Sequence, residues 1–358
     1  MRRISSYLGV ALAVLLMTVN VLPVSAAVPG GSAGLSIPPR KNYIIEPGHS
    51  ITDKLTIGNL DPEHSLNLSL RMIDFTFTGQ TGTPKLDLAQ NAPLRPWSIR
   101  PYTTLPSSVT IQPGGTTTIK YSIRMPKNIG AGSYYSAILY DAAGGNGGNV
   151  ALTASGVTLV FVSVPGIVNE NLQLQKFGAY ESNNNGATGG FVFIATNGAP
   201  KMIGYVLKNK GNVFESPAGS IIIKDMFGHQ VANIDTNTTQ ELALLGQSRL
   251  FTSCIKTKAQ EIRLEGGTST DTSCVDPGLA PGEYTAHLEL YYGQNGNQTH
   301  EITNTVSFWY LPWWFLALIA VGIGILIWAF FWTKRKLQAA VKGTTYHEGR
   351  GIRRLWRR

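Results

Sequence analysis

The chain has 358 residues, with 30 lysines and arginines against 21 aspartates and glutamates, for a formal net charge of +9 at pH 7. An excess of basic residues can indicate nucleic-acid binding, and whether it does so depends on where in the chain the charges lie. Nine basic residues and one acidic residue follow Trp332, and Arg2 and Arg3 lie near the start. The stretch between therefore carries 19 basic and 20 acidic residues. Because the excess is confined to the two ends, we expect no nucleic-acid partner.

The first 27 residues have the pattern of a signal peptide. Arg2 and Arg3 precede an apolar run over residues 8–21, and the small residues Val24, Ser25 and Ala26 come after it. This order of a basic, an apolar and a small-residue region is typical of a secretory leader. We predict a signal peptide at 1–27, cleaved after Ala26 or Ala27, and export of the mature chain.

Alternation of apolar and polar residues with period two dominates the sequence from 28 to 308. Residues 66–72 and 119–125 alternate strictly, and 157–164 is apolar almost throughout, as expected of a more central strand. Further strands are predicted at 135–140, 191–196, 204–208, 220–224, 284–292 and 302–308. Tight turns are predicted at Glu46-Pro47-Gly48, Gln112-Pro113-Gly114 and Asp225-Met226-Phe227-Gly228, which place glycine where a positive φ is needed. These patterns predict an all-β fold.

Two tandem immunoglobulin-like β-sandwiches account for this stretch, one at 28–166 and one at 167–308. The apolar strand stops at Pro165 and Gly166, and a new alternating series begins at Leu172. Short strands with regular turns are typical of sandwiches, and a single barrel is the alternative. The similar size of the two halves favours two sandwiches. Long polar loops, which often carry function, are expected at 78–91, 144–149 and 181–190.

The two cysteines, Cys254 and Cys274, both lie before the apolar C-terminal stretch. An even count in an exported chain favours a disulfide, with two free thiols as the alternative. Closing such a loop stabilises by about 3 kcal/mol in the chain-entropy model. The nineteen polar, turn-rich residues between them are predicted to form a surface loop.

No pattern for catalysis or metal binding is found in the sequence. The histidines before the apolar C-terminal stretch are not paired at metal-ligand spacing, and Gly-x-Ser-x-Gly and His-Glu-x-x-His are absent. We therefore predict that the chain is not an enzyme and takes no cofactor or metal. A surface hydrolase whose triad comes from distant loops remains an alternative.

Residues 311–332 contain no charge, and at about 1.5 Å per residue they span roughly 33 Å, the thickness of a bilayer core. We predict a transmembrane helix at 309–332, in preference to a buried helix of a soluble protein. Aromatic residues favour the two membrane interfaces and basic residues the cytoplasmic side. The predicted interface residues are Trp309, Tyr310, Trp313, Trp314, Trp328, Trp332, Lys334, Arg335 and Lys336.

Residues 333–358 are predicted to form a basic cytoplasmic tail. Its arginines and lysines would face anionic lipid headgroups, each contributing about 1 kcal/mol near the surface. A signal for membrane orientation alone is the alternative. The predicted topology is a single pass through the cell membrane, with the N-terminal ectodomain outside.

Several runs resemble the bacterial WxL-interacting cell-surface proteins. The runs are Asn209-Lys210-Gly211-Asn212-Val213, Pro217-Ala218-Gly219-Ser220, the stretch from Ile221 to Gly228, Leu245-Gly246-Gln247-Ser248-Arg249, and Pro281-Gly282-Glu283-Tyr284 through Tyr291-Tyr292-Gly293. Earlier in the chain, Glu46-Pro47-Gly48 before Leu55-Thr56-Ile57-Gly58-Asn59 is similar to their N-terminal immunoglobulin-like domain. The segment between the cysteines departs from the family pattern. The resemblance implies an anchored bacterial surface protein that binds other surface proteins or peptidoglycan.

From these observations we expect a binding or scaffolding module on the cell surface. An accessory subunit of a membrane complex, acting through its helix and tail, is the main alternative.

Overall fold

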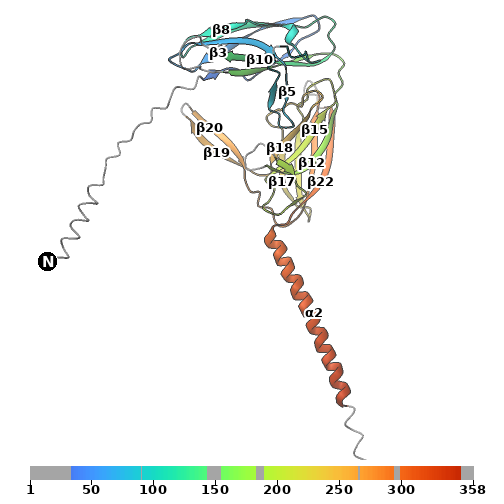
Figure 1. The fold of residues 1–358 in the computed structure, drawn as a ribbon. Coiled ribbons are helices and arrows are strands. Elements are labelled where there is room, and N and C mark those ends of the chain that lie inside the picture. Colours follow the sequence, from blue (N-terminus) through green and yellow to red (C-terminus); the bar gives the residue numbers. More distant parts are fainter. Residues whose placement is uncertain are drawn as a thin grey trace, which may run out of the picture.

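The computed structural model describes residues 34–89, 91–142, 155–182, 189–264, 267–293 and 299–347. The predicted signal peptide at 1–27, the predicted loop at 144–149, most of the loop predicted at 181–190, and residues 348–358 of the predicted tail lie outside them. The described chain contains two pairs of β-sheets, two small β-hairpins, a short 3-10 helix and one long C-terminal helix (Figure 1). The prediction of a mostly β fold with one apolar helix after it is confirmed.

The N-terminal pair joins a four-stranded and a five-stranded sheet. The first contains, in order, β1 (Leu35–Ser36), β3 (Ser50–Asn59), β9 (Thr116–Arg124) and β7 (Thr103–Thr104), with a short 3-10 helix η1 (Arg100–Tyr102) before β7. The second contains β2 (Arg40–Ile44), β11 (Ser155–Val164), β10 (Gly132–Ala142), β4 (Leu66–Ile73) and β8 (Ser108–Ile111). Buried side chains from both sheets, among them Leu55, Ile57, Leu68, Ile123, Tyr140 and Val160, form one core.

The C-terminal pair repeats this plan. One sheet contains β13 (Gly189–Phe191), β12 (Leu172–Ser182), β15 (Met202–Asn209) and β18 (Ser248–Cys254). The other contains β14 (Ile194–Ala195), β22 (His300–Tyr310), β21 (Gly282–Tyr292), β16 (Ala218–Asp225) and β17 (Gln230–Thr236). Its core includes Ile203, Tyr205, Ile221, Ile223, Leu288 and Phe308.

The predicted alternation is visible in the buried faces of the strands. In β4, Leu66, Leu68 and Leu70 are buried while Asn67 and Ser69 are exposed. Such a strand can cover a core only in one register, because a shift of one residue exposes the apolar face.

The three predicted turns are confirmed by their glycines, which take positive φ values at Gly48 (83°), Gly114 (60°) and Gly228 (85°). An L-residue with a Cβ rarely adopts this conformation, so each turn depends on its glycine.

A third core lies between the two sheet pairs. It contains Ile73, Phe75, Tyr135, Ala137, Leu139, Phe161, Leu242 and Leu244, and we call it the central core. The small hairpin of β5 (Phe75–Phe77) and β6 (Pro84–Leu86) contributes from the N-terminal side. Across the junction, the rings of Phe161 and Phe214 meet edge to face at 5.4 Å between centroids. The two pairs are thus packed against each other, not joined only by residues 165–171.

Three local predictions were wrong. Residues 84–86 of the loop predicted at 78–91 form strand β6, which pairs with β5. Residues 191–196 do not form one strand, because the chain turns at Phe193 and its two halves pair with different strands, β13 with β12 and β14 with β22. The segment between the cysteines is a β-hairpin of β19 (Thr257–Leu264) and β20 (Gly267–Cys274), where a loop was expected. In a polar hairpin no apolar alternation marks the strands, so the usual sequence signal is missing.

The helix also differs from its predicted bounds of 309–332. Strand β22 runs on to Tyr310, since Trp309 and Tyr310 pair with β21 and β14. The helix α2 spans Trp313–His347, and its window Trp313–Gln338 has a mean hydropathy of 2.5 and no buried residues. It is long and apolar enough to cross a membrane. Its extension beyond Trp332 is explained by the good helix formers, such as Lys334 to Ala340, that come next.

Substitution Leu244→Ala tests the central core. Leu244 is fully buried there, so truncation should lower the free energy of unfolding by about 3 kcal/mol, which urea denaturation of the detergent-solubilised full chain would measure. The matched control Leu94→Ala truncates an exposed leucine and should cost less than about 0.5 kcal/mol. Equal effects of the two changes would contradict the assignment of a central core.

Candidate functional site

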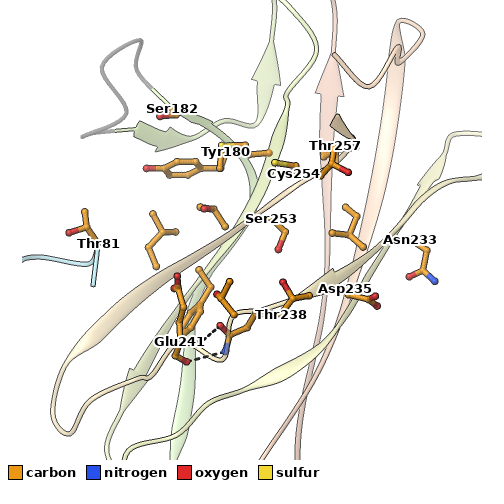
Figure 2. A pocket seen from close by; sticks show the side chains of 18 residues that line it. Thr81, Tyr180, Ser182, Asn233, Asp235, Thr238, Glu241, Ser253, Cys254 and Thr257 are labelled. Atoms are coloured by element: carbon orange, nitrogen blue, oxygen red, sulfur yellow. Dashed lines mark hydrogen bonds between the residues drawn. The ribbon is translucent and has the colours of Figure 1, made fainter. Parts of the chain in front are cut away.

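A groove of about 680 Å³ opens along one side of the C-terminal sheet pair, between strands β17 and β18. These strands lie at the edges of opposite sheets, where the sandwich is open. Figure 2 shows Tyr180 and Ser182 at one end of the groove, Glu241 and Thr238 at the other, and Asp235 on the β17 side. The lining consists mainly of hydroxyl, amide and carboxyl side chains, so the groove offers many hydrogen-bonding groups. Its apolar part is formed by Met202, Ile234, Leu250, Phe251 and Ile255.

Strand β18 is the edge strand of its sheet on the side of this groove. It pairs with β15 on one side only, in antiparallel register. The N–H of Leu250 points away from β15 and donates to the carbonyl of Gln80 at 2.9 Å. In an antiparallel pair, alternate residues direct their backbone groups outward, so Thr252 and Cys254 also face outward. An edge of this kind is a template for pairing with another extended chain.

The loop between β17 and β18 forms the rim of the groove and is held in an unusual conformation. Asn237 and Gln240 have φ values of 52° and 53°. The amide of Asn237 donates to the carbonyls of Pro217 (2.7 Å) and Glu241 (3.0 Å), and its oxygen accepts from the N–H of Glu241 (2.8 Å). Asparagine tolerates positive φ and makes such local bonds, which explains its use here. The rim is therefore shaped before any ligand arrives.

Arg249 ties the rim to the N-terminal sheet pair. Its side chain is 9% exposed and donates to the carboxylate of Glu241 at 2.7 Å and to the carbonyl of Leu242 at 2.6 Å. The guanidinium also lies over the ring of Phe77, 4.9 Å from its centroid. The guanidinium packs against Gly82 as well. A Cβ added to this glycine would lie only 2.4 Å from Nη2 of Arg249, so a larger residue would clash. One cation thus joins three segments of the chain.

Glu215 supports the rim from behind. Its backbone exchanges two hydrogen bonds with Ala243, at 2.7 and 3.2 Å, and the residue is only 2% exposed. Burial, with the like charge of Glu170, raises the pKa of Glu215 to about 8, although the N–H of Gly293 donates to its carboxylate. The carboxyl is thus neutral over much of the acidic and neutral range, since burial disfavours the charged form.

The predicted cysteine pair borders the groove. Cys254 and Cys274 form a disulfide with Cα atoms 5.1 Å apart, and Cys254 lines the groove with Thr257. The bond fixes the hairpin of β19 and β20 where it leaves the sheet pair. Within the described ranges, no group of three or more His, Cys, Asp or Glu side chains could hold a metal ion.

The predicted membrane-interface residues lie at two separate places. Trp309 and Tyr310 end strand β22, and the other seven lie on α2. Trp328 and Trp332 stack at 6.2 Å between centroids, and the ammonium of Lys336 lies 3.9 Å from the ring centroid of Trp332. The interface role of all nine residues stays a prediction.

Sequence reasoning did not identify Asn237, Glu241 or Arg249 as functional residues. Asn237 was visible only as the first residue of an Asn-x-Thr triplet, and Arg249 only as part of a run that resembles other proteins. Neither pattern indicates a groove, because their partners come from distant segments.

No protein-family model and no curated protein matches this chain. Among solved structures, it is similar to the class 5 fimbriae chaperone CfaA, with 10% identity, a TM-score of 0.36, and coverage of 76% of this chain and 98% of that one. The E. coli chaperone DraB has 12% identity and a TM-score of 0.32, covering 68% and 99%. The Salmonella enterica SafA pilin in complex with the SafB chaperone has 8% identity and a TM-score of 0.33, with coverage of 77% of this chain and 98% of that one. Likenesses this distant identify no family, so function is argued from the chain's own residues.

Substitution Arg249→Ala should destabilise the chain by about 2 kcal/mol, because it leaves the carbonyl of Leu242 and the carboxylate of Glu241 without their donor. Urea denaturation of the full chain would measure this loss. Arg124, an exposed arginine on β9, provides the matched control, and Arg124→Ala should change stability by less than about 0.5 kcal/mol. A loss no larger than that of the control would contradict the role given to Arg249.

Substitution Glu215→Gln tests the raised pKa. Between the ordinary value of 4.5 and about 8, the folded chain holds a proton at Glu215 that the unfolded chain has released. Wild-type stability therefore falls as pH rises through this window. The glutamine variant cannot ionise, so its stability relative to wild type should grow across the window and level off above it. Denaturation below, within and above the window would show this, and a constant difference would contradict it.

Proposed function

We propose that this chain is a membrane-anchored surface protein whose C-terminal sheet pair binds an extended segment of another surface protein. The segment would lie in the groove between β17 and β18. The observation that carries this proposal is the outward-facing backbone of β18 at Thr252 and Cys254, beside a groove rich in polar side chains.

Strand addition explains the main features of the groove. Backbone hydrogen bonds to a sheet edge supply affinity, and side chains along the groove supply selectivity. The chain already uses this edge once, because Gln80 accepts the N–H of Leu250. A partner strand would continue from there toward Cys254. The pre-shaped rim at Asn237 and the Arg249 anchor lower the ordering cost of binding.

Anchoring through α2 would keep the groove outside the cell. The apolar span Trp313–Gln338 supports a single membrane pass, and the basic residues after Trp332 support a cytoplasmic C-terminus with contacts to anionic lipid. The resemblance to WxL-interacting proteins suggests a surface protein or peptidoglycan as the ligand. Of these, an extended protein segment fits the β18 edge better, since the glycan strands of peptidoglycan have no peptide backbone and its stem peptides are too short to pair along a whole strand.

Substitution Thr252→Pro tests the edge. Proline removes the outward N–H and is tolerated at an edge whose N–H faces away from the sheet. Full-length wild type and variant, detergent-solubilised and immobilised, would be incubated with solubilised surface proteins and with isolated cell walls from the source cells. We expect binding of a surface protein to weaken by about tenfold in the variant.

The matched control is Thr252→Ala, which removes the side chain and keeps the N–H. It should bind nearly as well as wild type, and all three proteins should melt at similar temperatures. Equal retention by the proline and alanine variants would contradict strand addition at β18. Retention only on cell walls, unaffected by the proline, would point to peptidoglycan as the ligand.

A further inference from the structure

The connection between the C-terminal sheet pair and the helix is very short. Strand β22 ends at Tyr310 and α2 begins at Trp313, so their Cα atoms can be at most about 11 Å apart. The two linking residues are also tied down. The N–H of Leu311 donates to the carbonyl of Ala195 at 2.9 Å, and Pro312 is buried. The end of the sheet pair from which α2 leaves, visible below β17 and β22 in Figure 1, is therefore held beside the start of the helix.

This end of the sheet pair, which we call the base, carries exposed apolar side chains. They are Phe193 (62% exposed), Ile194 (51%), Met226 (52%) and Phe227 (77%). Single exposed apolar residues are normal on a protein surface, whereas a group of four large ones at one end calls for a partner. The helix start adds Trp313 and Trp314, which are also exposed.

Pairing places these four residues close to the helix. Ile194 pairs with Trp309 in parallel register, and the carbonyl of Phe193 accepts from the N–H of Trp309 at 2.8 Å. The methyl group of Met226 packs against Gly282. A Cβ added to this glycine would lie only 2.3 Å from that methyl group. Gly282 in turn pairs with Tyr310, the last residue of β22.

Several polar groups of the turn that presents Phe227 are hydrogen-bonded within the turn. The carboxylate of Asp225 accepts from the N–H groups of Phe227 (2.9 Å) and His229 (2.8 Å), and its other oxygen lies 3.1 Å from Nδ1 of His229. These bonds occupy the carboxylate of Asp225, while the phenyl ring of Phe227 lies beside the His229 ring on one side, at 6.3 Å between centroids, and stays largely exposed. A turn with bonded backbone groups and an exposed aromatic ring is suited to a membrane interface, where unpaired polar groups are costly.

We propose that the base of the C-terminal sheet pair rests on the bilayer, with Phe193, Ile194, Met226 and Phe227 inserted into the headgroup layer. The proposal rests on the membrane anchoring proposed for α2. A headgroup layer is roughly 5 to 8 Å thick, comparable to the reach of the two-residue linker, so a helix that spans the bilayer from Trp313 brings the base of the sheet pair to this layer. Their apolar area then gains a partner, and aromatic rings favour this layer.

A consequence is that the ectodomain would stand in a defined orientation. With two side contacts besides the helix, from the 193–194 corner and the 225–228 turn, the sheet pair could not swing freely about Pro312. The groove between β17 and β18 would then be held at a set height above the membrane, which limits the segments of a partner that can reach it.

The test measures how deep each position lies in a membrane. Full-length protein carrying Phe227→Cys, labelled with a nitroxide, would be reconstituted into phosphatidylcholine liposomes, and collisions with oxygen and with a water-soluble nickel complex would be compared by electron paramagnetic resonance. The native cysteines are joined in a disulfide and take no label. We expect the oxygen-to-nickel ratio at position 227 to exceed several-fold that of the control Leu60→Cys, an exposed position on the N-terminal sheet pair. Ile194→Cys should behave like Phe227→Cys.

A label at Leu326→Cys, near the middle of the apolar span, tests the membrane anchor separately from the contact of the base with the membrane. A lipid-buried signal at 326 with a water-exposed signal at 227 and 194 would overturn the membrane-contacting base and leave the anchor intact. A water-exposed signal at 326 would overturn the anchor itself. Dipolar broadening between labels at 227, without increased oxygen access, would assign the patch to a second copy of the chain and overturn contact with lipid.

Discussion

The central core holds the two sheet pairs against each other and links the N-terminal pair to the groove. Leu242 and Leu244 are buried in it, and they belong to the same loop that begins at Asn237 and forms the rim of the groove. Because protein interiors are close-packed, the position of these two leucines is constrained by the rings of the N-terminal side. The shape of the groove on the C-terminal pair is thus set partly by residues from the other pair.

Polar contacts at the edge of this core fix how the β5–β6 hairpin lies relative to β18. Arg249 bonds to Glu241 and Leu242 while lying over Phe77, and Gln247 accepts from the N–H of Phe77 at 2.9 Å. Apolar contact alone permits many arrangements of two surfaces, whereas these directional hydrogen bonds form in only one of them. The β5–β6 hairpin is placed beside β18 in this way, and it covers one part of the β18 edge while leaving the groove open.

The C-terminal sheet pair therefore has three surfaces with different chemistry. Its upper end is apolar and packed against the N-terminal pair, its side carries the polar groove, and its base carries the apolar side chains around Phe227. The disulfide between Cys254 and Cys274 borders the groove and fixes the hairpin that leaves there. Such a division allows one small domain to attach, orient and bind without any surface serving two purposes.

Much of the fold could be predicted because its signals are local. The alternation in residues 66–72, the glycine turns at Gly48 and Gly228, and the uncharged stretch before Lys334 each depend on neighbours in the sequence. The hairpin between the cysteines escaped this reasoning because its polar strands lack an apolar face. The corner at Phe193 escaped it because each half pairs with a different partner strand, which the sequence around 191–196 does not reveal.

The β-rich character, the turns and the apolar helix follow from local sequence patterns, since period and composition act over a few residues. In contrast, the shared core of Tyr135 and Leu244, the contact of Arg249 with Phe77, and the contact of Met226 with Gly282 arise from long-range packing. Alternation indicates which face of a strand is buried, but not against what. The partner of a buried face depends on contacts between distant segments, which must match in shape and in hydrogen bonding at the same time. No short stretch of sequence contains this information.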